Sequence, residues 1–75
     1  QLDTVFASEQ REEVMEALSH LSDDHKQILL LRYYDDLSYA EIADVLQVKL
    51  GTVMSRLSRA RMRLMAVMGE NEVAN

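Results

Sequence analysis

Apolar residues recur along the second half of this chain at the spacing of one helix face. Five of them stand at positions i, i+4, i+7, i+11 and i+14 and so form one stripe on a single long helix: Val53, Leu57, Ala60, Leu64 and Val67. A shorter helix is predicted just before it, because Ile42, Ala43 and Leu46 also have helical spacing. Two helices joined this closely predict a helix-turn-helix whose second helix faces outward.

The shorter of these two helices has a clear N-cap sequence at its start, but the turn that follows it has no clear C-cap sequence. Ser38 is followed three residues later by Glu41, which predicts a capping box in which hydroxyl and carboxylate satisfy backbone donors reciprocally. Gln47 stands where a glycine commonly ends such a helix. A left-handed Gln47 would cost about 1 kcal/mol, or else the turn closes differently. Lys49 is likewise a poor N-cap.

Two further helices are predicted in the first half. Ser8 is a plausible N-cap for a helix that runs to about His20, and Ser22, followed by two aspartates, restarts the chain as a second helix. Residues 28–31 are apolar nearly all round, so this helix should lie at the centre of the core. We therefore expect an all-α, four-helix domain with a C-terminal helix-turn-helix, a homeodomain-like or winged-helix-like three-helix core without a wing.

The composition agrees with this fold and limits the kinds of site and the cellular location that we expect. The chain has 75 residues, no proline, no cysteine and two glycines, which favours one small helical domain without disulfides or thiolate metal sites. No apolar run approaches the about 20 residues that span a bilayer, and we expect no membrane partner and a cytoplasmic location. The chain begins at Gln1, so we interpret it as a piece of a longer protein: a linker remnant at 1–7, the domain at 8–68 and a disordered tail at 69–75.

Charge is strongly polarised along the chain. Its net charge of −5 hides a basic segment, because residues 49–68 hold five basic and no acidic residues, whereas residues 1–48 hold three basic residues against eleven acids. A localised basic stripe is a candidate electrostatic footprint for nucleic acid. The first helix has an acidic face, which is either merely solvated or a docking or repulsive surface: Glu9, Glu12, Glu13 and Glu16.

No residue pattern predicts an enzyme. His20 and His25 are five residues apart, which is not the i, i+4 spacing of a helical metal pair. The chain has no nucleophile elbow and no glycine-rich phosphate loop. We therefore expect no catalysis, no metal and no cofactor.

An extended string of residues resembles a known family. YAEIADVL followed by GTVMSRLSRAR is similar to region 4 of bacterial sigma-70 factors, specifically the extracytoplasmic-function group, and LLLRYYDDLSYAEIA extends the resemblance upstream, over residues 18–64 in all. The resemblance implies that the domain recognises the minus-35 promoter element as duplex DNA and engages the β flap of RNA polymerase, which performs the catalysis. It also implies a probable anti-sigma factor as a partner.

Helical geometry orients the candidate site. With Val53 at the centre of the core side, four residues fall about 140–200° away: Gly51, Ser55, Ser58 and Met62. An N-terminal half of the helix that is small in the middle and basic at its margins suits entry into a major groove. Arg59 is the first candidate for a base contact. Twelve residues form the predicted DNA-binding set: Ser38, Tyr39, Lys49, Gly51, Thr52, Met54, Ser55, Arg56, Ser58, Arg59, Arg61 and Arg63.

Within this set the roles differ. Ser55 and Ser58 are weaker base candidates, and phosphates are assigned to four cations: Lys49, Arg56, Arg61 and Arg63. Arg56 has a structural alternative, an ion pair with Glu41 across the two helices. Met54 departs from the family, in which lysine or arginine often reaches DNA from that position.

Two other classes of function stay open. A response-regulator output domain has a similar four-helix fold, although the longer family-like string argues against it. A sigma-like module that binds proteins without DNA is favoured by the overall acidity and by a Met-rich helix face.

Overall fold

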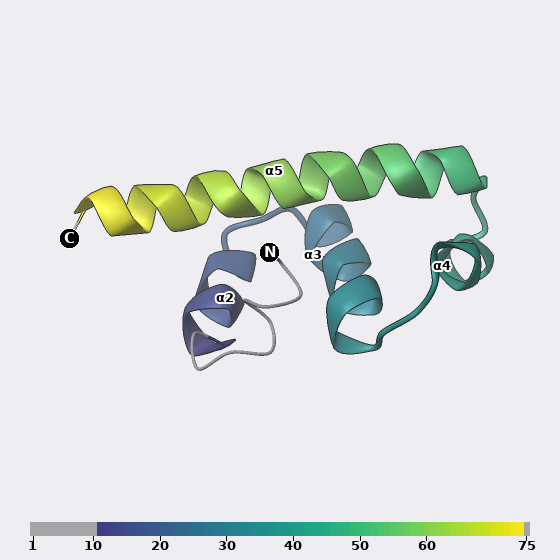
Figure 1. Cartoon of the computed structure of the whole chain (residues 1–75), viewed down its shortest axis with the longest axis horizontal. Helices are drawn as coiled ribbons and strands as arrows, with labels where there is room; N and C mark the ends of the chain where they lie inside the picture. Colours follow the sequence, from purple (N-terminus) through teal and green to yellow (C-terminus); the bar gives the residue numbers. More distant parts are fainter. Residues whose placement is uncertain (1–10, 75) are drawn as a thin grey trace.

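One long helix organises the described part of the molecule, and the shorter helical segments pack beneath it. The computed structural model describes residues 11–74 of the chain, which measures 39 × 20 × 18 Å. In chain order the elements are α2 (Arg11–Leu18), α3 (Asp23–Leu29), the π-helical turn η1 (Leu30–Tyr34), α4 (Tyr39–Leu46) and α5 (Leu50–Ala74). Figure 1 shows α5 running along the whole length, with α2, α3 and α4 on one side of it. The expected all-α fold with a C-terminal helix-turn-helix is confirmed.

The core forms where the apolar stripe of α5 meets the other helices. All five predicted stripe residues are buried, from Val53 at 0% exposed to Val67 at 7%. They pack against one cluster contributed by the earlier segments: Val14, Ala17, Leu18, Leu21, Ile28, Leu29 and Ile42. The core lies between α5 and the shorter helices, so the opposite side of α5 is left for solvent or a partner.

The predicted starts of α3 and α4 are confirmed. The Ser22 hydroxyl accepts a hydrogen bond from the His25 amide at 3.3 Å. The capping box of α4 is complete, because the Ser38 hydroxyl accepts from the Glu41 amide at 3.1 Å and the Glu41 carboxylate accepts from the Ser38 amide at 2.7 Å. These bonds satisfy amides that have no partner inside a helix.

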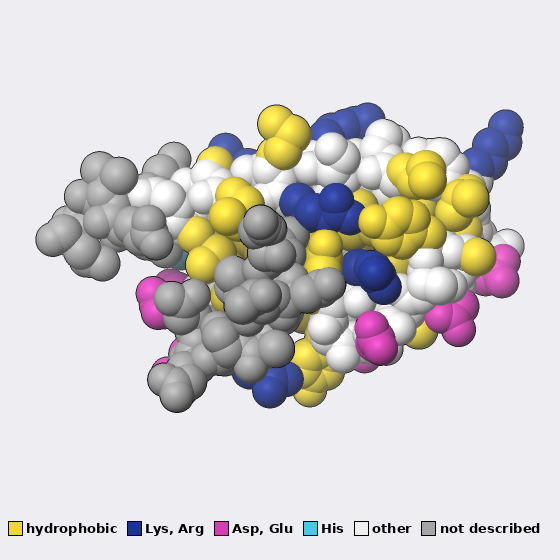
Figure 2. All heavy atoms as spheres, in the orientation of Figure 1, with side chains coloured by type: hydrophobic (Ala, Val, Ile, Leu, Met, Phe, Trp, Pro, Cys, Tyr) yellow, Lys and Arg dark blue, Asp and Glu magenta, His cyan; other side chains and the backbone are white. Residues whose placement is uncertain are grey.

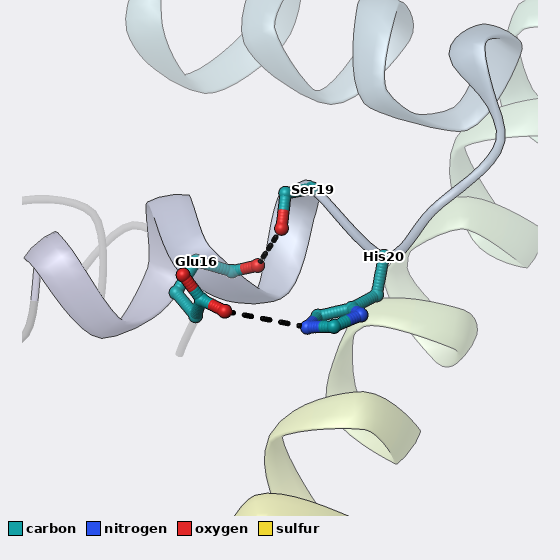
Figure 3. A network of polar contacts seen from close by, with 3 residues as sticks. All are labelled: Glu16, Ser19 and His20. Atoms are coloured by element: carbon teal, nitrogen blue, oxygen red, sulfur yellow. Dashed lines mark hydrogen bonds and ion pairs between the residues drawn. The ribbon is translucent and has the colours of Figure 1, made fainter.

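The first helix ends earlier than predicted. Its expected N-cap, Ser8, lies outside the described residues, and α2 stops at Leu18 rather than at about His20. The last turn tightens, since the amides of Ser19, His20 and Leu21 each bond three residues back. Figure 3 shows the same end of the helix, where the Ser19 hydroxyl donates to the Glu16 carbonyl and His20 Nε2 lies 3.4 Å from the Glu16 carboxylate.

A π-helical turn follows α3 and was not predicted. In η1 the amide of Asp35 donates to the carbonyl of Leu30, five residues back, at 2.9 Å. Such a turn holds one residue more than an α-helical turn, and a run of similar apolar residues carries no signal for it. The chain then leaves through Asp36, which has a positive φ of 59°. This wide turn sets where α4 begins.

The turn of the helix-turn-helix closes through a left-handed residue, which is the first of the two forms expected from the sequence. Gln47 adopts the left-handed conformation, with φ 58° and ψ 48°, and its side-chain amide donates to the Asp44 carbonyl at 2.7 Å. The next amide, that of Val48, donates to the Ala43 carbonyl at 3.0 Å. The carbonyl of Lys49 accepts from Thr52 and Val53 and so opens α5. The backbone therefore closes the turn without a glycine or a side-chain N-cap.

From Gly69, where a disordered tail was predicted, the structure continues α5 to Ala74; the disordered tail stays a prediction. Gly69 does not take a positive φ, so it does not end the helix in the way that glycine often does. The domain boundary predicted at residue 68 is not marked by any break in the backbone. Although α5 is long, no helix among residues 11–74 is both long and apolar enough to cross a membrane.

Candidate nucleic-acid interface

The side of α5 that faces away from the core presents a strip of small residues. Gly51, Ser55 and Ser58 are all exposed, as the helical geometry predicted. A methyl group added to Gly51 would meet no atom within 4 Å, so packing does not require a glycine there. The Ser55 hydroxyl donates back to the Gly51 carbonyl at 3.1 Å, which uses its proton within the helix. Ser55 therefore offers only acceptor lone pairs outward.

One margin of this strip is basic. Arg59 and Arg63 are exposed, Arg56 is half-buried, and Lys49 is exposed at the start of the helix. Within the described part of the chain no carboxylate pairs with these four cations, and the alternative pair between Arg56 and Glu41 is absent. The Glu41 carboxylate is used in the capping box instead. The cations are thus available to phosphate groups, which charge-assisted bonds hold well.

The structure places Arg61 differently from the other arginines. Its Nη2 atom donates to the hydroxyl of Tyr39, on α4, at 2.7 Å. Partial burial acts to lower the pKa of Arg61, but the hydrogen bond to Tyr39 and the interaction with Tyr33 outweigh it, so the pKa lies above its usual value. The Arg61 guanidinium therefore stays protonated and positively charged while the chain is folded. In the free chain it joins α5 to α4 and does not line the basic margin.

A second arginine, which the sequence did not single out, contacts the ring of the same tyrosine. The guanidinium of Arg32 is 5.3 Å from the centre of the Tyr39 ring and 5.9 Å from that of Tyr33, and its Nη1 donates to the Leu37 carbonyl at 3.0 Å. We call Arg32, Tyr39 and Arg61 the Tyr39 cluster. The cluster links η1, α4 and α5. It gives Arg32 a structural role within an otherwise apolar segment. That isolated cation is the one sequence signal from which the cluster could have been predicted.

The Tyr39 cluster also bears on two of the predicted site residues. Tyr39 is half-buried, with its ring near Arg32 and its hydroxyl bonded to Arg61, while Ser38 is exposed but uses its hydroxyl in the cap. The Nε atoms of Arg32 and Arg61 are buried and have no hydrogen-bond partner among the residues that the structure describes. The cluster therefore acts first as a brace that holds the two helices of the motif together.

The remaining predicted residues flank the small strip. Thr52 is half-buried on the basic side, and Met54 is 52% exposed on the other. Figure 2 shows several basic side chains along the border of the molecule that α5 forms and none of the acidic ones there, whereas the acidic side chains lie toward the opposite border, where one basic side chain is also visible. The acidic face predicted for the first helix is partly described: Glu12, Glu13 and Glu16 are exposed on α2, and Glu9 lies outside the described residues. Charge is therefore segregated in space as well as in sequence.

Comparison with known proteins shows that the sequence of the chain matches a known family. The family described as "Sigma-70, region 4" matches residues 11–64. The chain is 38% identical over 58 residues to "ECF RNA polymerase sigma factor SigK" of Mycobacterium ulcerans, which covers 77% of the chain and 31% of the relative. It is 32% identical over 59 residues to "ECF RNA polymerase sigma factor SigW" of Bacillus subtilis, covering 79% of the chain and 32% of the relative.

A third relative gives the same picture. "ECF RNA polymerase sigma-E factor" of Salmonella typhimurium is 39% identical over 57 residues, which are 76% of the chain and 30% of the relative. The chain thus spans about a third of the length of these curated relatives. No solved structure matches significantly. The matched region contains α2 to α4 and the first fifteen residues of α5, and the chain therefore belongs to the sigma-70 region 4 family.

Proposed function

We propose that this chain is the promoter-binding domain of an RNA polymerase sigma factor of the extracytoplasmic-function type, acting in bacterial transcription initiation. In this role the outward face of α5 enters the major groove of the minus-35 element. One observation carries the proposal: a strip of small residues on α5 is bordered by cations that no carboxylate neutralises within the described residues. Phosphates border a groove and base edges form its floor, so this order of side chains fits duplex DNA.

The roles within the site follow from position. Arg59 stands beside the small strip and is assigned to a base edge, while Lys49, Arg56 and Arg63 are assigned to phosphates. Gly51 allows close approach of the backbone, and Ser55 and Ser58 are the weaker candidates for base contacts. Thr52 and Ser38 belong to the predicted set without an assigned contact. Arg61 is the exception, since it lies against Tyr39 in the free chain. Its predicted phosphate contact stays a prediction.

The partners follow from the family. RNA polymerase core, through its β flap, would hold the domain near the promoter and would perform the catalysis. An anti-sigma factor would cover the same surfaces, and the site of action would be the cytoplasm. Membership of the sigma-70 region 4 family disfavours the response-regulator alternative. The acidic remainder of the chain should keep the affinity of the isolated domain for DNA low, so polymerase would supply part of the binding.

Binding to a promoter duplex at several salt concentrations tests the proposal. If about four phosphates are neutralised, log K should fall with log salt at a slope near −3.6. A scrambled duplex of equal length is the control for specificity. Absence of a salt slope, or equal affinity for the scrambled duplex, would contradict specific promoter recognition.

Two arginine variants test the assignment of roles. Arg59→Ala should cost about 1–3 kcal/mol and relax preference at one base pair, because one bidentate base contact is lost. Arg63→Ala should weaken binding to all sequences about equally. Specificity profiles of both variants measure the difference, and identical profiles would show that the roles are wrongly divided.

A second candidate function, a protein-binding module without DNA affinity, is favoured by one specific feature. Met54, Met62 and Met65 are 52%, 70% and 47% exposed on α5, and exposed methionines suit adaptable protein interfaces. Polymerase core that binds the chain tightly while promoter duplex shows no salt-dependent binding would favour this candidate.

A further inference from the structure

The margin of α5 opposite the basic one is apolar and exposed. Leu50 is 47% exposed and Met54 is 52% exposed, and because they are four residues apart they share one face at the start of the helix. Val45, near the end of α4, is 56% exposed as well. Figure 2 shows hydrophobic side chains gathered on the surface at the end of the molecule where α4 meets α5. Exposed apolar groups that gather in this way commonly mark a contact surface.

Geometry places this apolar margin beside the strip of small residues. On a helical projection Leu50 and Met54 lie about 60° and 100° from Val53, and Gly51 lies about 160° away, with Arg59 beyond it at about 240°. The two margins therefore border the small strip on opposite sides. A helix inserted with the strip toward the groove floor brings Arg59 near the bases on one side and the apolar pair near them on the other.

The chemical groups that the major groove exposes determine what Leu50 and Met54 could contact. Leucine and methionine form no bond with a phosphate, and the thymine 5-methyl is the apolar group that the major groove displays. We propose that Leu50 and Met54 bind thymine methyl groups in the DNA that this chain recognises. The inference rests on the function proposed above and adds to it a base preference that does not depend on the arginines.

The spacing of the pair limits where the thymines lie. Side chains at i and i+4 have Cβ atoms about 5–6 Å apart, and successive bases of one strand are about 3.4 Å apart along the axis. The two residues would therefore contact thymines that are neighbours or separated by one base. Methionine has a flexible, unbranched side chain, so Met54 is suited to reach the outer of the two.

Selection of binding sites from two duplex libraries tests this inference directly. One random library contains thymine, and the other contains deoxyuridine, which pairs identically but lacks the methyl group. The 75-residue chain should enrich thymine at one or two nearby positions of the first library. Enrichment at those positions should vanish in the second, with the preference due to Arg59 unchanged. On a single selected duplex, each deoxyuridine substituted there should weaken binding about fourfold, the value for burying one methyl or methylene group.

Matched variants connect the effect to the two residues. Leu50→Ala combined with Met54→Ala should bind thymine and deoxyuridine duplexes equally. Met62→Ala is the control, since Met62 is 70% exposed but lies about 12 Å further along the helix than Met54. This control variant should keep the thymine preference. All three positions are exposed, and thermal melting confirms that each variant is folded.

Three results would overturn the inference. Equal selection from both libraries by the unmodified chain would show that no methyl group is contacted, although the proposed promoter recognition would stand. A thymine preference that survives the double variant would assign the methyl contact to other residues. A double variant that loses polymerase binding and keeps its thymine preference would place the apolar margin in a protein interface. Failure to enrich any sequence at low salt, where phosphate contacts contribute most to the affinity of the isolated domain, and also in the presence of polymerase core, would instead contradict the proposed function itself.

Discussion

The hydroxyl of Tyr39 offers the sharpest test of how the helix-turn-helix is held together. It accepts the hydrogen bond from Arg61 at 2.7 Å between residues 22 positions apart, so it joins α4 to α5 through tertiary structure alone. Tyr39→Phe removes this oxygen and keeps the ring, which preserves the contact at 5.3 Å with the Arg32 guanidinium. The substitution therefore isolates one bond of the Tyr39 cluster.

The magnitude follows from the charge and burial of the pair. A hydrogen bond to a charged group contributes about 1.5–3 kcal/mol when well protected, but Arg61 and Tyr39 are only partly buried, so water would replace part of it. Because Arg61 Nε already lacks a partner among the described residues, the guanidinium would lose its bond to Tyr39 and keep only its interaction with Tyr33. We expect the free energy of unfolding to fall by about 1 kcal/mol, and Tm to fall by about 4–8 °C for a domain of this size.

Thermal and urea unfolding followed by circular dichroism measure the change, and two further variants control it. Tyr34→Phe removes the hydroxyl of a tyrosine that is 59% exposed and should change stability by less than about 0.5 kcal/mol. In an Arg61→Met background Tyr39→Phe should cost little, because the partner of the hydroxyl is already absent. If Tyr39→Phe and Tyr34→Phe melt at the same temperature, the bond contributes nothing and the cluster does not brace the motif.

Two local predictions concern the ends of α4. Ser38→Ala should destabilise the domain by about 0.5–2 kcal/mol, because it removes the hydroxyl of the capping box, and urea unfolding compared with the exposed Ser58→Ala would reveal the loss; equal midpoints would argue that the cap is not needed. Gln47→Gly should stabilise the domain by up to about 1 kcal/mol, since glycine adopts the left-handed conformation without the strain of a side chain. A lower melting temperature for Gln47→Gly would mean that the side-chain bond to Asp44, at 2.7 Å, matters more than the strain.

Much of this fold was predictable because its signals are local. Ser22 and Ser38 cap the helices that they were expected to cap, since a cap bond needs only residues three apart. The stripe from Val53 to Val67 is buried as predicted, because one helical period relates all of its members. The same period placed Gly51 and Ser58 on the exposed side of α5. The candidate site was thus predictable to the extent that it is a face of one helix.

Tertiary structure decided which side chains form contacts between different helices. Arg61 was grouped with the other arginines by charge, yet it binds Tyr39, and Arg32 became part of the same cluster only because η1 brings it there. Arg56 forms no ion pair with Glu41 within the described residues, and the Glu41 carboxylate accepts from the Ser38 amide in its own cap. Charge and periodicity describe the order of side chains around one helix. Which neighbour each side chain meets depends on how the helices cross, and the extra residue of a π-helical turn changes that crossing without leaving a mark in the sequence pattern.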